Sequence, residues 1–345
     1  MLFSELPGHN KIKDILLHTA ANNRIGHAYL FEGPSGVGKI NFAKAFAQRL
    51  LCENPIHAEA CGKCPSCSRC ESGNHPDLSI VTNQLYDPTK KSTDILVETI
   101  RKMKSDVYVK PFLSTRKIYI IPKADTMNLY SQNSLLKVLE EPPGYCTIIL
   151  LAENSNSFLP TIRSRVSEIK FYPLSEEEVE CELSKIFHSA DAEKIKLASK
   201  MSGGSLTMAK QFVEDEDKNL LRDELLNAVF ALWEGRRKAI YDFSLLLKKN
   251  KDQIEFLMSI MRDLFRDILY IKQTNDSKGI INLDRRIKIE KLAENTTQKT
   301  SLRLIEIFLK YSDYFSKNIG YGSISQCIGL ELWEAINDRG YRSKI

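Results

Sequence analysis

Five short apolar runs divide the first half of the chain, and polar or turn-forming residues flank each of them. The runs cover residues 28–31, 78–82, 117–121, 147–152 and 168–171. The runs at 28–31, 117–121 and 147–152 contain few charges and do not alternate with polar positions, which predicts strands that are buried on both faces.

Segments with helical spacing separate the first four of these runs. Apolar residues recur every three or four positions in residues 39–52, 95–107 and 131–141, which predicts a helix in each segment. Strands that alternate with helices indicate a parallel sheet covered on both faces, the doubly wound α/β class. We therefore predict an α/β domain over residues 1–172.

The pattern changes after Pro173, because no further strand-like run appears and helical spacing continues. Residues 173–214 predict a small domain of about three helices, which begins with the capping-box sequence Ser175-Glu176-Glu177-Glu178. Residues 215–345 predict a larger bundle of amphipathic helices. The sequence thus predicts two helical domains after the α/β domain.

The composition is that of an ordinary globular protein. Of the 345 residues, 43% are apolar and 27% are charged, which excludes a disordered or fibrous chain. No run approaches the roughly 20 apolar residues of a membrane span, and charged residues interrupt the N-terminal stretch where a signal peptide would be apolar. We therefore expect a cytoplasmic protein with no membrane contact. The net charge of +5 permits contact with nucleic acid but does not by itself predict it.

A glycine-rich stretch, residues 33–40, lies between the first predicted strand and the first predicted helix. In a phosphate-binding loop (P-loop), glycines let backbone N–H groups close around a phosphate at a helix N-terminus, and a lysine reaches the terminal phosphates. The residues that match are Gly33, Gly36, Gly38 and Lys39. Ile40 stands where a hydroxyl side chain would bind magnesium. The sequence predicts a phosphate cradle that lacks one metal ligand.

Five of the eight cysteines cluster, at Cys52, Cys61, Cys64, Cys67 and Cys70. Clustered thiols at two-residue gaps in a cytosolic chain predict a metal site rather than disulfides. Tetrahedral zinc takes four ligands, so five cysteines compete for four places, and His57 and His75 are further candidates. An iron–sulfur cluster is the alternative, although ferredoxin-type runs end in a wider gap followed by proline. Residues 61–76 lack a periodic apolar pattern, which predicts an inserted loop held by the metal.

Two further motifs complete a family pattern. Residues 133–143 read Asn-Ser-Leu-Leu-Lys-Val-Leu-Glu-Glu-Pro-Pro, and residues 163–166 read Arg-Ser-Arg-Val. With the glycine-rich loop and the cysteine insert, they make the chain resemble the bacterial clamp-loader proteins of the AAA+ class over nearly its full length. This resemblance implies an AAA+ core with a zinc module at about residues 52–70, a helical lid domain and a helical collar through which subunits assemble. It also implies the zinc ligands Cys52, Cys61, Cys64 and Cys67 and leaves Cys70 as an extra thiol.

The same resemblance assigns roles to two further residues. It implies that Arg165 is an arginine finger, which stabilises the charge on a γ-phosphate bound by a neighbouring subunit. A surface ion pair is the other interpretation of a lone arginine. The resemblance also implies that Asn154 is the polar residue of the core that senses the phosphate.

Four positions lack the side chain that the family uses. Ile40 removes a magnesium ligand, Pro122 and Lys123 stand where the two Walker B acids belong, and Thr207 replaces an arginine of the lid. Asp125 lies beyond the end of the strand, and we do not expect it to replace those acids. Because hydrolysis needs these groups together, the resemblance implies a chain that does not hydrolyse ATP. Binding of ATP or ADP by Lys39 and the loop stays possible, as does an empty pocket.

The resemblance therefore implies a non-hydrolysing subunit of a replicative clamp loader. Such a subunit would assemble with motor and clamp-opening subunits through its collar, and the complex would place a sliding clamp on primed DNA. Two alternatives stay open. One is an ATP-hydrolysing motor subunit of the same complex, and the other is a stand-alone zinc-dependent nucleic-acid-binding protein, although the cysteine insert has few basic or aromatic residues.

Overall fold

The structure is a computed structural model that describes residues 1–90, 92, 94–277, 279–316 and 321–337. The chain divides into two compact units. The first contains Met1–Glu182 and Ser202–Met208, and the second contains Leu183–Met201 and the residues from Ala209 onward. The predicted small helical domain, residues 173–214, is shared between the two units, and its boundaries stay a prediction. Positions 338–345 of the predicted bundle lie outside the described residues.

A five-stranded sheet forms the centre of the first unit. Its strands are β1 (Ala28–Glu32), β2 (Leu78–Ile80), β3 (Lys117–Ile121), β4 (Cys146–Ala152) and β5 (Ser167–Lys170). The spatial order is β2-β3-β4-β1-β5, and each neighbouring pair is parallel. The prediction of a parallel α/β sheet is confirmed, and each strand lies on or within a residue or two of its apolar run.

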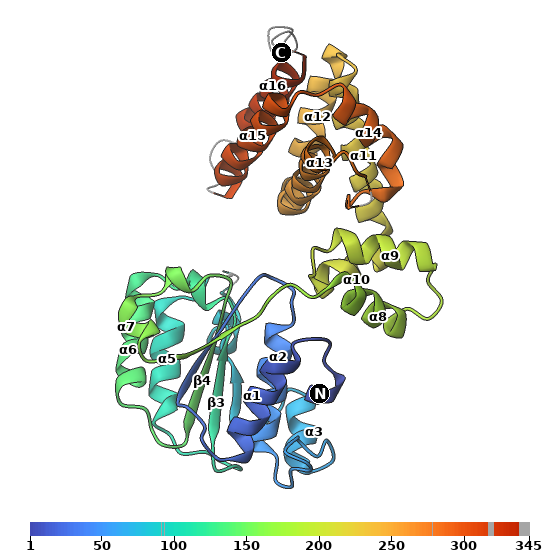
Figure 1. Ribbon diagram of the computed structural model, residues 1–345. Coiled ribbons are helices and arrows are strands. Elements are labelled where there is room, and N and C mark those ends of the chain that lie inside the picture. The colour runs from blue at the N-terminus through green and yellow to red at the C-terminus, as the bar shows by residue number, and fades with distance from the viewer. Residues whose placement is uncertain (91, 93, 278, 317–320, 338–345) are drawn as a thin grey trace. The chain divides into compact units, whose positions relative to one another are not determined.

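Helices cover both faces of this sheet (Figure 1). The long ones are α1 (Asn10–Ala21), α2 (Lys39–Leu51), α5 (Val97–Val107) and α6 (Leu129–Glu140). Ile118 and Ile120 of β3 belong to the core that contains α1 and α2, whereas Tyr119 and Ile121 belong to the core that contains α5 and α6. Successive side chains of a strand point to opposite faces, so a sheet with two cores needs strands that are apolar throughout.

Short helices lie in segments where the apolar pattern did not predict any. They are α3 (Pro65–Glu71), α4 (Asn83–Tyr86) and α7 (Pro160–Arg163), with the 3-10 turns η1 (Phe3–Glu5), η2 (Ala124–Thr126) and η3 (Ser155–Ser157). Helix α3 corrects the prediction of a loop through the cysteine segment. Two helical turns are too short to show an apolar period. The start of α3 is set instead by Pro65 at its first position and by the sulfur of Cys64, which accepts the N–H of Cys67.

The rest of the described chain is helical. The elements are α8 (Glu176–Ile186), α9 (Ala192–Met201), α10 (Leu206–Glu214), α11 (Glu216–Trp233), α12 (Arg237–Lys249), η4 (Lys251–Gln253), α13 (Ile254–Thr274), η5 (Leu283–Arg285), α14 (Arg286–Glu294), α15 (Gln298–Ser316) and α16 (Tyr321–Asn337). The apolar pattern of the predicted bundle has helical runs near residues 220–233, 238–247, 253–271, 302–315 and 324–336, so it missed α14. The predicted capping box is confirmed. The Glu178 carboxylate accepts the backbone N–H of Ser175 at 2.9 Å, and the Ser175 hydroxyl oxygen accepts the backbone N–H of Glu178 at 3.1 Å. Within the described ranges no helix combines the length and apolarity that crossing a bilayer requires.

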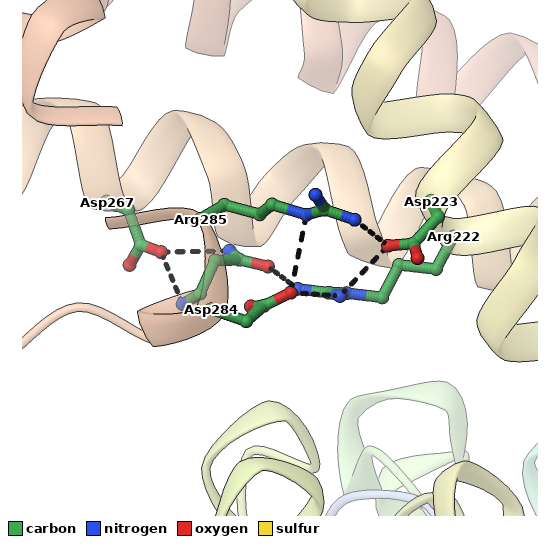
Figure 2. Close-up of polar contacts among 6 residues, drawn as sticks. Arg222, Asp223, Asp267, Asp284 and Arg285 are labelled. Atoms are coloured by element: carbon green, nitrogen blue, oxygen red, sulfur yellow. Dashed lines mark hydrogen bonds and ion pairs between the residues drawn. The ribbon is translucent and has the colours of Figure 1, made fainter. Parts of the chain in front are cut away.

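Buried charges tie the segment before α14 to α11 in the second unit (Figure 2). The Arg222 side chain, only 5% exposed, donates two hydrogen bonds to the Asp284 carboxylate and one to the Asn282 side chain, each 2.8 Å long. Asp267 on α13 accepts the backbone and side-chain N–H groups of Asn282 at 2.9 Å each. Because a charge away from water is costly without its partners, this network favours one packing of α11, α13 and η5.

Candidate functional site

The glycine-rich loop joins the end of β1 to the start of α2, the position of a phosphate-binding loop. The N–H of Gly33 donates to the carbonyl of Ala152 at the end of β4, 3.1 Å away. Gly36 and Gly38 have φ angles of +77° and +98°, in the left-handed region that favours glycine. A Cβ atom on Gly36 would overlap the hydroxyl of Ser205. The path of the loop therefore needs these glycines for steric reasons alone.

Lys39 is the first residue of α2, and its half-buried side chain folds back onto its own loop. Its Nζ donates hydrogen bonds to the carbonyls of Gly33 and Pro34, at 2.5 and 2.7 Å. Burial lowers the pKa of Lys39, and the nearby carboxylates of Glu153 and Asp125 oppose that change. A phosphate bound in this loop would have to compete with the two carbonyls for the ammonium group.

Four positions depart from the family pattern, and the structure shows where each of them lies. Ile40 is partly buried and packs against the apolar core of α1 and α2. Pro122 follows the last residue of β3, and Lys123 comes next with a left-handed φ of +49°. The backbone N–H of Thr207 donates to the carbonyl of Gly36 at 3.4 Å. The segment around Thr207, here called the lid segment, therefore contacts the glycine loop through its backbone. Thr207 itself brings no positive charge to the loop.

Two polar residues after β3 and β4 are used to shape turns. The Asp125 carboxylate accepts the N–H of Glu153 at 2.9 Å. Asn154 precedes η3, and its side-chain oxygen accepts the N–H of Asn156 at 2.9 Å. The side-chain carbonyl of Asn154 is therefore engaged in this turn. The phosphate-sensing role of Asn154 stays a prediction.

Four cysteine sulfur atoms come together at the start of α3. The Sγ atoms of Cys52, Cys61, Cys64 and Cys67 all lie within 4.8 Å of one another. Those of Cys61 and Cys67 are 3.9 Å apart. Zinc–sulfur bonds of about 2.3 Å give a tetrahedron with edges of about 3.8 Å. These four residues are the set that the family resemblance selects, and their sulfur atoms fit one tetrahedral metal ion.

Backbone N–H groups point at three of these sulfur atoms. The N–H of Cys61 lies 3.3 Å from the sulfur of Cys52, that of Cys64 lies 3.3 Å from Cys61, and that of Cys67 lies 3.4 Å from Cys64. Backbone hydrogen bonds from Lys63 and Cys64 lower the pKa of Cys61 to about 6. Donors aimed at sulfur favour the thiolate, which is the form that binds metal ions.

The fifth cysteine and the two nearby histidines lie outside this group of four. Cys70 packs against the core of α1 and α2, and burial raises the pKa of its thiol to about 12. His75 is buried, and its Nδ1 accepts the N–H of Asp77 at 3.1 Å. His57 is exposed on a turn with a left-handed φ of +47°. Of the seven candidate ligands, the tertiary structure thus brings four cysteines together and leaves the other three residues outside the group.

Arg165 lies in a recess of about 420 Å³ between the end of α6 and the start of β5. Its side chain is 36% exposed, and its guanidinium lies 3.2 Å from the carboxylate of Glu140. The same guanidinium donates to the carbonyl of Thr161 at 2.9 Å. His27 also lines the recess, and its buried Nε2 has no hydrogen-bond partner among the described residues.

Sequence reasoning missed both neighbours of Arg165. Glu140 lies in the Glu-Glu-Pro-Pro end of α6 and was noted only as part of that motif. His27 precedes β1 and carried no motif signal. The sequence contains no periodicity that pairs either residue with position 165, because the contacts form only when α6, β1 and β5 come together in the fold.

Two sequence models of protein families match this chain. The model described as DNA polymerase III, delta subunit, matches residues 8–175, and the model of the C-terminal part of that subunit matches residues 217–321. The DNA polymerase III subunit delta' of Bacillus subtilis (strain 168) is 29% identical over 334 residues, which cover 94% of this chain and 96% of that protein. The chain belongs to the DNA polymerase III clamp-loader subunit family.

Other members of the clamp-loader family are similar as well. The DNA polymerase III subunit tau of Bacillus subtilis (strain 168) is 27% identical over 336 residues, which cover 89% of this chain and 57% of that subunit. Among solved structures, a DNA polymerase III gamma subunit-related protein from Thermotoga maritima covers 91% of this chain and 99% of its own. With 17% identity and a TM-score of 0.40, that structure supports no conclusion about function.

Proposed function

We propose that this chain is a non-hydrolysing, delta-prime-type subunit of a bacterial replicative clamp loader. The observation that carries the proposal is a complete glycine loop whose surroundings lack the catalytic side chains. The residues at the catalytic positions are Ile40, Pro122, Lys123 and Thr207. Phosphoryl transfer depends on a metal ion and on groups that position water and stabilise charge, so their joint absence reduces hydrolysis to background.

The chemical contribution of this subunit is the guanidinium of Arg165, which acts on ATP bound by a neighbouring motor subunit. Arg165 is partly exposed, and it is paired with Glu140, also partly exposed, in an open recess. Exchange of that carboxylate for a γ-phosphate keeps the guanidinium paired with oxygen anions while it stabilises the transition state.

The cysteine module holds zinc in this proposal, through Cys52, Cys61, Cys64 and Cys67. A separation of 3.9 Å between two of the sulfur atoms suits one shared ion. In an iron–sulfur cluster the four cysteines bind two or four different irons, so their sulfur atoms would not all surround one centre, whereas here all four lie within 4.8 Å of one another. Zinc supplies a structural crosslink here, because all four ligands come from the protein and no position is left for substrate.

The remaining parts of the proposed role follow from the clamp-loader assignment. The glycine loop and Lys39 keep the groups that hold a phosphate, so a bound ATP or ADP would stay unhydrolysed there, and an empty pocket is the alternative. The collar, residues 215–345, assembles with gamma/tau-type motor subunits and a delta-type clamp-opening subunit. The chain meets the sliding clamp and primed DNA only within that complex, in the cytoplasm.

Reconstitution of the complex with Arg165→Ala tests this role. We expect the variant to assemble normally, while hydrolysis at the adjacent motor site falls by about 100-fold or more. Arg163→Ala is the matched control, because Arg163 is 40% exposed, two residues away, and paired with Glu168. Single-turnover ATP hydrolysis and clamp loading on primed DNA are the measurements.

Other outcomes of the same reconstitution favour other functions. Normal hydrolysis by the Arg165→Ala complex would show that the finger assignment is wrong. Magnesium-dependent turnover by the isolated chain, abolished by Lys39→Ala, would identify a motor subunit instead. Tight DNA binding by the isolated chain, lost on chelation of its metal, would identify a stand-alone nucleic-acid-binding protein.

A further inference from the structure

A cluster of exposed apolar side chains follows α5 in the first unit. Residues 108–113, here called the apolar loop, include Tyr108, Val109, Phe112 and Leu113, and each of these four side chains is at least 46% exposed. Phe112 is the extreme case at 81%. Several large apolar side chains exposed within one short segment are unusual on a protein surface. Such a loop keeps one conformation only if hydrogen bonds fix its backbone.

A single buried carboxylate holds the end of the apolar loop. Asp77 lies just before β2 and is 1% exposed. Its two oxygens accept the N–H groups of Phe112 at 2.6 Å, Leu113 at 2.8 Å and Ser114 at 2.8 Å. Three hydrogen bonds to one buried charge are strong and directional, so the position of Asp77 sets the position of the loop.

His75 connects Asp77 to helix α3. Its Nδ1 accepts the N–H of Asp77, so the ring proton is on Nε2. That Nε2 lies 3.4 Å from the hydroxyl of Ser66 and 3.4 Å from the hydroxyl of Ser114. One imidazole N–H is thus directed at both α3 and the end of the apolar loop.

Ser66 belongs to the cysteine module, which comprises residues 52–70 and most of α3. It is buried on α3 between Cys64 and Cys67, and its hydroxyl donates to the Glu53 carboxylate, one residue after Cys52, at 2.9 Å. The apolar core of the module consists of Ala60, Cys64 and Cys67 with three partly buried neighbours. Apart from Cys70, which packs against the core of α1 and α2, helix α3 has only this small core to hold it. Bonds to a metal ion therefore add much of what keeps Ser66 in place.

We infer that the cysteine module positions the apolar loop through Ser66, His75 and Asp77, so that loss of the metal loosens a surface on the far side of this relay. The inference rests on the proposed metal site. It gives the module a role in positioning the apolar loop, beyond holding its own fold, and it makes Ser66, His75 and Asp77 positioning residues.

Hydrogen exchange of the full chain tests the relay at the amides of Phe112, Leu113 and Ser114. Removal of zinc by a chelator should speed their exchange by about tenfold or more, because Asp77 then loses the restraint from His75 and keeps only the hydrogen bond from the N–H of Ile118 on β3 to its carbonyl. The amides of β3 and β4 should keep their protection, which separates local loosening from unfolding of the sheet.

Ser66→Ala tests the link without touching a metal ligand. We expect one bound zinc per chain and exchange of the three amides about fivefold faster, the effect of one lost neutral hydrogen bond. Ser68→Ala is the matched control, since Ser68 is exposed on the same helix. Asp77→Asn should give the largest increase at the three amides, because it removes the charge that they share.

The outcomes separate this inference from the metal site on which it rests. A chain that binds no zinc would overturn both. A zinc-bound chain whose three amides exchange at the same rate after chelation and in Ser66→Ala would overturn the inference alone and leave the metal site standing.

Discussion

The glycine loop and the cysteine module are the two candidate binding sites of the first unit, and they are built in opposite ways. The loop owes its shape to backbone: Gly33 bonds to β4, Gly36 bonds to Thr207, and the neighbouring Ile40 packs into the core. The module owes its shape to four sulfur atoms around which there is little apolar packing.

This difference explains how each site tolerates change. A loop fixed by the sheet can lose its catalytic side chains and keep its form, because none of those side chains holds the backbone. A module whose fold depends on its metal ligands cannot lose those ligands and keep its form, because metal binding and folding are coupled. The chain accordingly departs from the family pattern around the loop and retains all four cysteines that the pattern places in the module.

Removal of one metal ligand should have the largest effect. We expect Cys64→Ala to weaken zinc binding by more than about 100-fold, since loss of even an outer-shell partner costs about 10–100-fold. Cys70→Ala is the control and should still bind one zinc per chain, because Cys70 lies outside the group of four. Competition titration with a chromophoric chelator measures both. Equal losses in the two variants would contradict the assignment of the ligands.

A side chain added to the glycine loop should have an intermediate effect. Gly36→Ala places a Cβ against Ser205 at a φ of +77°, whereas Gly73→Ala meets nothing within 4 Å at a φ of +75°. The backbone cost of about 1–2 kcal/mol is common to both, so we expect Gly36→Ala to lose about 1 kcal/mol more. Urea unfolding of the two variants measures the difference. Equal stabilities would mean that the lid segment does not constrain the loop.

Restoration of the missing hydroxyl should have the smallest effect. Ile40→Thr supplies the magnesium ligand of the family pattern, but Pro122 and Lys123 still stand where the acids belong. We expect no magnesium-dependent ATP hydrolysis and a loss of stability of about 1 kcal/mol, from the apolar contact that Ile40 makes. A phosphate-release assay on the isolated variant measures turnover. Steady hydrolysis would mean that one side chain, rather than a set, had silenced this site.

Several features were predictable from the sequence because they are local. The five strands followed from apolar runs, the glycine loop from residues within one turn, and the capping box from residues three apart. The cysteine cluster was visible as spacing, although five cysteines and two histidines remained in competition. Helix α3 was missed because it is shorter than the period that would reveal it.

The sequence by itself determined the strands, the long helices of the first unit, the fold class and which side chains of the family pattern are missing, since these depend on residue type and on neighbours along the chain. The tertiary structure brings together the four cysteines that the family resemblance selects. It alone decided that Glu140 faces Arg165 and that Asp77 holds the apolar loop. It also decided the pairing of Arg222 with Asp284, which lie 62 positions apart. Contacts at such separations leave no periodic trace, because they arise only when packing of the apolar faces brings distant polar groups together and burial then requires them to pair.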